Sequence, residues 1–238
     1  ISLGTSGTIF ISSESFGVDP HNALHSFAHA DGGYHLMGCM LSAASCNKWF
    51  LEDVLHTSDY AAQQADITEE KLGRNRVFFL PYLMGERSPI NDTDARAAFI
   101  GMSMDTSRAD MVQAVLEGVA FAIRDSFEVA RSLGVDIPRS MICGGGSKSP
   151  LWTKIMANVL NIPLDIPVTE QGPGYGGAML AMVACGEFES VRAAAHALVK
   201  VKATVTPDAA LAALYAERYA RFRLIYPAMK PLFKTLAR

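Results

Sequence analysis

Two short glycine-rich segments have the residue types that could hold a phosphate group. One is Gly4-Thr5-Ser6-Gly7, and the other is Gly144-Gly145-Gly146, which is followed by Ser147 and Ser149. Glycine lets backbone N–H groups approach an anion closely, and serine or threonine hydroxyls add further donors. Taken alone, each segment is more simply explained as a hairpin turn or a tight strand-to-helix connection. A phosphate site therefore requires the two segments to meet in space.

A third cluster, Gly172-Pro173-Gly174-Tyr175-Gly176-Gly177, formally fits the G-x-G-x-x-G pattern of dinucleotide-binding turns. The residues after it are mostly helical in pattern, and no strand ending in Asp or Glu follows at the distance that a ribose contact requires. We therefore expect a helix that packs tightly against a sheet or a ligand at this point. A nicotinamide-dependent oxidoreductase is an alternative that rests on this cluster alone.

The other reactive side chains form no recognisable catalytic or metal-binding pattern. His21, His25 and His29 recur at four-residue steps, but the glycines and proline around them predict loop or strand rather than an aligned helical face. The chain has no G-x-S-x-G elbow and no evident base beside Cys143, so acyl transfer has no support. We assign no catalytic residue and no metal ligand. Four carboxylates could include a general base, although solvated positions are the default for them: Glu86, Asp92, Asp94 and Glu117.

Strands and helices alternate along the chain in a pattern typical of an α/β protein. The strands are expected at residues 1–12 (a hairpin), 34–39, 77–80, 140–143 and 164–168. The helices are expected at residues 40–55, from about 106 to 134, 150–160, 178–185 and 208–226, the last ended by Pro227. Residues 81–96 form a long polar loop of the kind that is often functional.

Composition narrows the choice of partners. The 238 residues are 50% hydrophobic and 19% charged, with a formal net charge of −3, which is typical of a globular chain. The clustered Lys and Arg of a nucleic-acid-binding face are lacking, and no apolar run approaches the roughly 18 residues that span a bilayer. Four dispersed cysteines fit a reducing compartment. We predict a cytoplasmic protein whose partners are small molecules or proteins, with no nucleic acid and no membrane.

Several segments, in order, resemble the FGGY family of carbohydrate kinases, and most closely its xylulokinases. The stretch Ala97-x-Phe99-x-Gly101-Met102, followed by Asp110-Met111-x-x-Ala114-Val115-Leu116-Glu117, matches the second signature of that family. Residues 80–92 are similar to the xylulokinase loop, residues 4–7 to the second phosphate turn and residues 144–152 to the adenosine turn. The ending at residues 226–233 is also similar, so the resemblance covers nearly the whole chain.

The resemblance implies an actin-like ATPase fold of the ribonuclease H type, with a mixed sheet and helices on both faces. Residues 1–238 would form the C-terminal, nucleotide-binding half of a two-domain sugar kinase. The N-terminal sugar-binding domain and the catalytic aspartate would lie upstream of Ile1, which already falls inside an expected strand. The resemblance also implies nucleotide contacts at eight positions: Gly4, Thr5 and Ser6 at the β- and γ-phosphates, Ala44 and Lys48 on the first helix, Gly145 and Gly146 at the α-phosphate and ribose, and Ser149 near adenine.

The function implied by the resemblance is transfer of the γ-phosphate of ATP, with Mg²⁺, to the hydroxyl of a small sugar. D-xylulose, giving D-xylulose 5-phosphate, is the favoured substrate. Such a transfer depends mainly on positioning and on neutralising charge, which backbone turns and Mg²⁺ supply. A kinase for gluconate or another ketose and a non-catalytic actin-like ATP-binding protein are the alternatives. The sequence leaves open whether the chain forms a homodimer.

Overall fold

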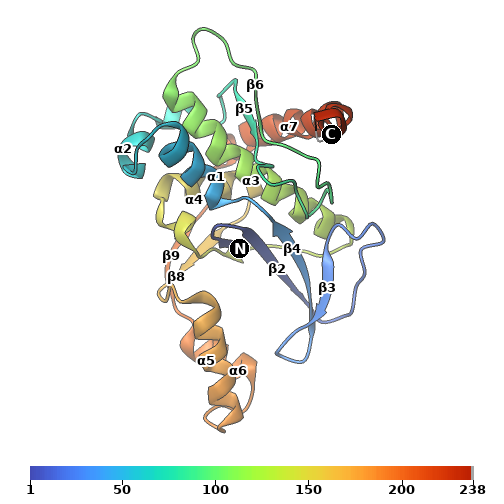
Figure 1. The fold of residues 1–238 in the computed structure, drawn as a ribbon. Coiled ribbons are helices and arrows are strands. Elements are labelled where there is room, and N and C mark those ends of the chain that lie inside the picture. Colours follow the sequence, from blue (N-terminus) through green and yellow to red (C-terminus); the bar gives the residue numbers. More distant parts are fainter. Residues whose placement is uncertain (237–238) are drawn as a thin grey trace.

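A mixed β-sheet runs through the middle of the computed structural model, which describes residues 1–236 (Figure 1). One part of the sheet is antiparallel with the order β1-β2-β4-β3: β1 (Ser2–Leu3), β2 (Gly7–Ser13), β4 (Tyr34–Met40) and β3 (His25–Ala28). The other part has the order β7-β8-β9, with β7 parallel to β8 and β9 antiparallel to it: β7 (Ser140–Met141), β8 (Leu164–Pro167) and β9 (Val201–Val205).

The short strand β1 joins these two parts. The backbone N–H of Leu3 donates to the Cys143 carbonyl at 2.8 Å, and the Cys143 N–H donates to the Ile1 carbonyl at 2.9 Å. Ser2 and Cys143 are therefore paired in parallel, while the other edge of β1 pairs with β2. Two segments about 140 residues apart in the sequence thus lie side by side in one sheet.

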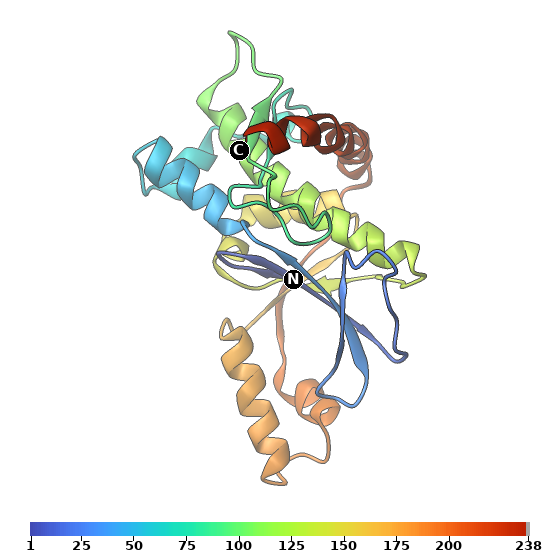
Figure 2. The ribbon, with the colours of Figure 1, turned by 45° about the vertical axis from the view of Figure 1, so that its right-hand side comes forward.

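Helices lie on both sides of this sheet. On one side lie α3 (Arg108–Ser132), α4 (Pro150–Leu160) and α7 (Ala209–Leu236), while α5 (Gly172–Ala184) and α6 (Val191–Leu198) project from the other (Figures 1 and 2). Short elements complete the chain: α1 (Ala44–Lys48), the π-helical η1 (Trp49–Val54), α2 (Tyr60–Ala65), the 3-10 helices η2 (Glu69–Lys71) and η3 (Gly145–Lys148), and the antiparallel pair β5 (Phe78–Leu80) and β6 (Ala98–Ile100). No helix within residues 1–236 is both long and apolar enough to cross a membrane.

Helix α3 is the centre of the core. It begins with a capping box, in which the Ser107 hydroxyl accepts from the Asp110 N–H and the Asp110 carboxylate accepts from the Ser107 N–H. Its middle is buried, and it includes Glu117, whose Oε2 lies 2.7 Å from Nη2 of Arg218 on α7. The Tyr215 hydroxyl donates to Oε1 of the same carboxylate at 3.0 Å. A hydrogen-bonded buried ion pair therefore fixes α7 against α3.

Most of the expected elements are confirmed. The hairpin at residues 1–12, the strands near 34, 77, 140 and 164, and the helices from 106 and from 150 are all present within a few residues. The helix expected at residues 40–55 begins at Ala44 and changes to π-helical hydrogen bonding at Trp49. Helix α6 and strand β9 were not predicted.

Two expectations were wrong. The glycine cluster at residues 172–177 forms the first turns of α5, as expected of a helix, but a Cβ placed at Gly174, Gly176 or Gly177 would meet no atom of residues 1–236 within 4 Å, so the expected tight contact with a sheet is wrong. Helix α7 does not end at Pro227 but continues through Pro231 to Leu236. A proline inside a helix costs about 3 kcal/mol or more. Burial of Phe233, which is 1% exposed, offsets part of that cost.

Candidate functional site

The two glycine-rich turns open onto one cavity of about 790 Å³. Its walls come from the β1–β2 turn, from α1 and α2, and from η3 with the start of α4. Seven of the eight residues singled out in the sequence line it: Gly4, Thr5, Ala44, Lys48, Gly145, Gly146 and Ser149. The eighth, Ser6, is not among the lining residues, and its hydroxyl lies 3.4 Å from the Leu41 carbonyl. The structure therefore brings together segments from the start and the middle of the chain.

Backbone hydrogen bonds fix the first turn against α1. The Thr5 carbonyl accepts from the Ala43 N–H at 2.9 Å and from the Ser45 hydroxyl at 2.8 Å. The Gly4 carbonyl accepts from the Ala44 N–H at 2.8 Å. With their carbonyls held by α1, the residues of this turn are fixed in position at the wall of the cavity.

The second turn rests on the same strand as the first. Gly144 has φ of +93°, a left-handed conformation that favours glycine. A Cβ on Gly146 would lie 2.6 Å from the side chain of Leu3, which is fully buried in β1 beneath the turn. The Ser147 hydroxyl donates back to the Gly144 carbonyl at 2.7 Å. Because β1 lies beneath one turn and leads into the other, the two turns are held in a fixed relation.

The charges of the cavity favour an anion. Its only charged lining residues within the described part of the chain are Lys48 and Lys148, and no carboxylate is among them. The hydroxyls of Thr5 and Ser45 and the glycine backbone add neutral donors. A cavity of this size is in the range of sites that hold small molecules. The arrangement fits an elongated ligand with a negatively charged end.

Helix α2 supplies lining residues that the sequence did not reveal. The Gln64 side-chain oxygen lies 2.6 Å from the Ser149 hydroxyl, which also accepts from the Trp152 N–H at 3.1 Å as the N-cap of α4. Tyr60 and Ala61 of the same helix also line the cavity. A usable signal was present, since Asp59 caps the short helix by accepting from the Ala62 N–H at 2.9 Å.

The wall near α1 is reinforced by polar contacts between α2 and η1. The Tyr60 hydroxyl donates to Oε1 of Glu52 at 2.8 Å. Burial and this carboxylate raise the pKa of Tyr60 to about 12, so the phenol stays protonated at neutral pH. Lys48 lies 3.8 Å from Oε2 of the same glutamate, and its side chain is 66% exposed, so it can turn toward a ligand.

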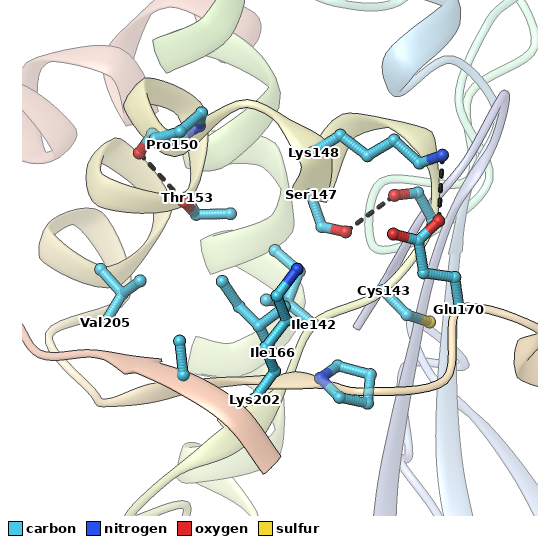
Figure 3. Close-up of a pocket in the computed structure, with 13 residues that line it drawn as sticks. Ile142, Cys143, Ser147, Lys148, Pro150, Thr153, Ile166, Glu170, Lys202 and Val205 are labelled. Carbon is cyan, nitrogen blue, oxygen red and sulfur yellow. Dashed lines mark hydrogen bonds and ion pairs between the residues drawn. The ribbon is translucent and has the colours of Figure 1, made fainter. Parts of the chain in front are cut away.

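A second cavity, of about 450 Å³, is also lined by residues of the η3 turn (Figure 3). Its apolar wall includes Ile142, Ile166 and Val205, and it shares Lys148 with the larger cavity. Figure 3 shows the ammonium group of Lys148 directed at Glu170, with the two charged groups 2.9 Å apart. Lys148 therefore stands at the boundary between the two cavities.

A buried carboxylate, Glu86, ties the long loop to the segment before α1. Its Oε1 accepts from the Leu41 N–H at 2.8 Å and from the Arg87 N–H at 2.7 Å, while Oε2 is buried and has no hydrogen-bond partner among residues 1–236. Burial raises the pKa of Glu86 to about 7, although the two backbone donors act in the opposite direction. Glu86 therefore links residues 81–96 to the chain segment that supports the first turn.

No cluster of three or more His, Cys, Asp or Glu side chains suited to a metal ion occurs within residues 1–236. His29 and His35 approach each other with their Nδ1 atoms 3.2 Å apart, and His25 accepts from Nε of Arg87 at 3.2 Å. The histidines singled out in the sequence therefore lie on loops and on β3, not on one helical face. The glycines of residues 172–177 are absent from the lining of the large cavity.

Comparison with known proteins places the chain in a family. Residues 1–185 match the FGGY family of carbohydrate kinases, C-terminal domain. The xylulose kinase of Escherichia coli K12 is 37% identical over 98% of this chain and 48% of its own length. A solved structure of a "xyloylose kinase" from Brucella ovis, 36% identical, superposes with a TM-score of 0.89 over 97% of this chain and 47% of that one. A gluconate kinase from Lactobacillus acidophilus, 24% identical, shares the fold with a TM-score of 0.89 over 99% and 48%.

The chain belongs to the FGGY family of carbohydrate kinases. Its fold is that of the C-terminal half of these two-domain sugar kinases, so the expected actin-like α/β architecture is confirmed. The chain spans about half the length of the curated relatives it matches.

Proposed function

We propose that this chain is the nucleotide-binding half of an ATP-dependent sugar kinase that transfers the γ-phosphate of ATP to a sugar hydroxyl, with D-xylulose as the substrate and D-xylulose 5-phosphate as the product. The observation that carries the proposal is the cavity on which both glycine-rich turns open, with two lysines and no carboxylate in its lining. The proposed location is the cytoplasm. Residues 1–238 are proposed to act as one domain.

In this proposal the chain positions the nucleotide and leaves the sugar hydroxyl to be activated elsewhere. Gly4 and Thr5 hold the β- and γ-phosphates, Ser6 is assigned no contact because it is not among the cavity-lining residues, and Gly145 and Gly146 lie along the α-phosphate and ribose. Such backbone donors are fixed before the reaction, so they stabilise the developing charge without reorganising. No residue of this chain is assigned as the catalytic base.

Mg²⁺ is the proposed metal. It retains several waters and binds through substrate phosphates together with one or two carboxylates. Because the lining of the cavity contains hydroxyls and amide groups but no carboxylate, the phosphates would supply the ligands on this side. Bound there, Mg²⁺ would neutralise phosphate charge during transfer.

The proposed partner of this half is the sugar-binding half of the same kinase, and α5 is the surface on which it would pack. None of the 13 residues of α5 is buried and none is charged, with Leu180 and Met182 at 44% and 37% exposed. Figure 2 shows α5 projecting from the sheet on the side opposite α3 and α7, beside α6, which Arg192 links to Asp31 at 3.2 Å. An exposed apolar surface of this kind marks a contact site. Hydrogen exchange in α5 that is equally fast in this chain and in the full-length kinase would contradict the assignment.

Two alternatives remain: a kinase that acts on gluconate or another ketose, and an ATP-binding protein that is not catalytic. The gluconate kinase fold superposes as well as that of the "xyloylose kinase", so shape alone does not select the sugar. Sequence identity favours xylulose, because the xylulose kinase of Escherichia coli and the "xyloylose kinase" of Brucella ovis are 37% and 36% identical to this chain. Release of ADP by the full-length kinase with D-xylulose, gluconate and other ketoses decides between them. No release with any sugar, combined with ATP binding, would favour a non-catalytic protein.

The nucleotide assignment is tested by Thr5→Ala. Thr5 is exposed and lines the cavity, so the variant should fold normally. Loss of a hydrogen bond to a charged group costs about 1.5–3 kcal/mol, so calorimetry should show ATP binding weakened by about tenfold or more. Ser12→Ala, which removes an exposed hydroxyl from β2 outside the cavity, is the control. Equal ATP affinity in Thr5→Ala and wild type would refute the assignment of this turn.

A further inference from the structure

The side-chain amide of Gln64 is held in one orientation. Ser149 Oγ accepts from the Trp152 N–H at 3.1 Å, and it lies 2.6 Å from Gln64. A serine hydroxyl has a single proton. The hydroxyl donates that proton to Oε1 of Gln64, so the amide presents its carbonyl oxygen to Ser149. The amide orientation therefore follows from the hydrogen-bond pattern.

The fixed amide keeps free hydrogen-bonding capacity. The carbonyl oxygen has two lone pairs, of which Ser149 uses one, and the NH₂ group has two protons. Gln64 lines the large cavity together with Tyr60 and Trp152, and it is only partly buried. It can therefore offer one donor and one acceptor, side by side, to a ligand in the cavity.

The place of Gln64 corresponds to the base end of a nucleotide. The first glycine turn lies near the N-terminus in the middle of the sheet, and α2 lies at the edge of the molecule in both ribbon views (Figures 1 and 2). Thr5 and Gln64 nevertheless line the same cavity. A nucleotide whose terminal phosphates lie at Thr5 carries its base at the opposite end, toward α2 and the start of α4.

We infer that Gln64, oriented by Ser149, reads the edge of the purine base and makes the site selective for adenine over guanine. The inference rests on the proposed nucleotide-binding function. Adenine presents an amino donor at C6 next to a ring acceptor, and a glutamine amide pairs with both at once. Guanine presents an oxygen at C6, which reverses that donor and acceptor order on its N1 side and leaves two acceptors on its N7 side. A fixed amide that matches adenine therefore mismatches guanine.

The expected preference follows from the strength of such a pair. A bidentate pairing contributes about 1–3 kcal/mol of discrimination, which corresponds to a ratio of ATP to GTP affinity of about 5- to 150-fold. Two variants separate the roles of the two residues. Gln64→Ala removes the reading group and should bring the ratio to about one, mainly by weakening ATP binding. Ser149→Ala frees the amide to rotate, so it should lower the ratio by strengthening GTP binding, and Ser149→Thr should restore it.

The experiment measures binding of MgATP and MgGTP by calorimetry to this chain and to the full-length kinase. Gln63→Ala is the matched control, because Gln63 is the neighbouring glutamine on α2 and does not line the cavity. An unchanged ratio in Gln64→Ala, or a wild type without preference, overturns the inference while ATP binding upholds the proposed function. Absence of any nucleotide binding overturns both. A ratio that falls in Gln64→Ala and stays unchanged in Gln63→Ala supports the assignment.

Discussion

Alanine substitutions at the adjacent glycines Gly145 and Gly146 should have different effects. Gly146→Ala should lower the stability of the fold, and Gly145→Ala should weaken nucleotide binding. At Gly146 the new Cβ would lie 2.6 Å from Leu3 Cγ and Cδ2 and 3.0 Å from Trp152 Cζ3. Leu3 and Trp152 are 0% and 1% exposed, so neither side chain has free space into which it can move. Overpacking of this kind costs about 1–3 kcal/mol. At Gly145 the same atom would meet nothing within 4 Å, and alanine stabilises such a site by about 0.4–1 kcal/mol through the unfolded state.

The loss of ATP affinity, unlike the loss of stability, is expected in Gly145→Ala. Gly145 lines the cavity without any neighbour in front of it, so a methyl group there occupies space that a phosphate or ribose needs. The displaced ligand should lose about one charged hydrogen bond, so we expect Gly145→Ala to weaken ATP binding by about 1.5–3 kcal/mol while being at least as stable as wild type. Urea denaturation gives the free energy of unfolding of both variants, and calorimetry gives their ATP affinity. A Gly146→Ala protein as stable as wild type, or a Gly145→Ala protein with wild-type affinity, would refute the packing argument.

Two further predictions concern buried charges. The raised pKa of Glu86, about 7 against 4.5 when unfolded, means that the folded state retains a proton that the unfolded state has lost. The free energy of unfolding should therefore fall as the pH rises from about 4.5 to 7, by at most about 1.4 kcal/mol per pH unit. Glu86→Gln should remove this dependence. If urea denaturation gives the same pH dependence of the unfolding free energy for Glu86→Gln and wild type, the explanation is contradicted. Arg218→Met leaves Glu117 buried and unpaired, which should cost about 3–5 kcal/mol, and adding Glu117→Leu should restore part of the loss. Equal stability of the single and double variants in urea would exclude this explanation.

Helices and strands could be predicted where nearby residues, such as helix caps and a periodic apolar face, determine them. The capping box at Ser107 and the apolar face that follows it defined α3, and the serine and proline at residues 149–150 defined α4. Long-range contacts were not predictable in this way. The run from Pro227 to Leu236 stays helical because Phe233 packs into the core, and no local signal reports that burial. Strand β9 is formed by pairing with β8, although its own residues are largely exposed.

The site was predictable in its backbone turns and less so in its side chains. The two turns could be identified from the sequence because glycines and hydroxyl residues cluster in them, a composition that suits a phosphate site. Gln64 was not visible, since a single glutamine in the polar residues 58–75 resembles any solvated side chain. Its role depends on Ser149, 85 residues away, which only the folded chain brings within 2.6 Å.

The pairing of β1 explains why a site with walls so far apart in the sequence can be rigid. A two-residue strand has little stability of its own, but β1 is hydrogen-bonded on both edges and its Leu3 side chain fills the space beneath the second turn. The first turn follows directly from β1, so a displacement of either turn must disturb the same buried leucine. A ligand held by both turns binds only when β1 is in place, and at a concentration of 100 times its Kd it would stabilise that state by about 2.7 kcal/mol. Nucleotide binding and the integrity of the sheet junction are therefore expected to be coupled.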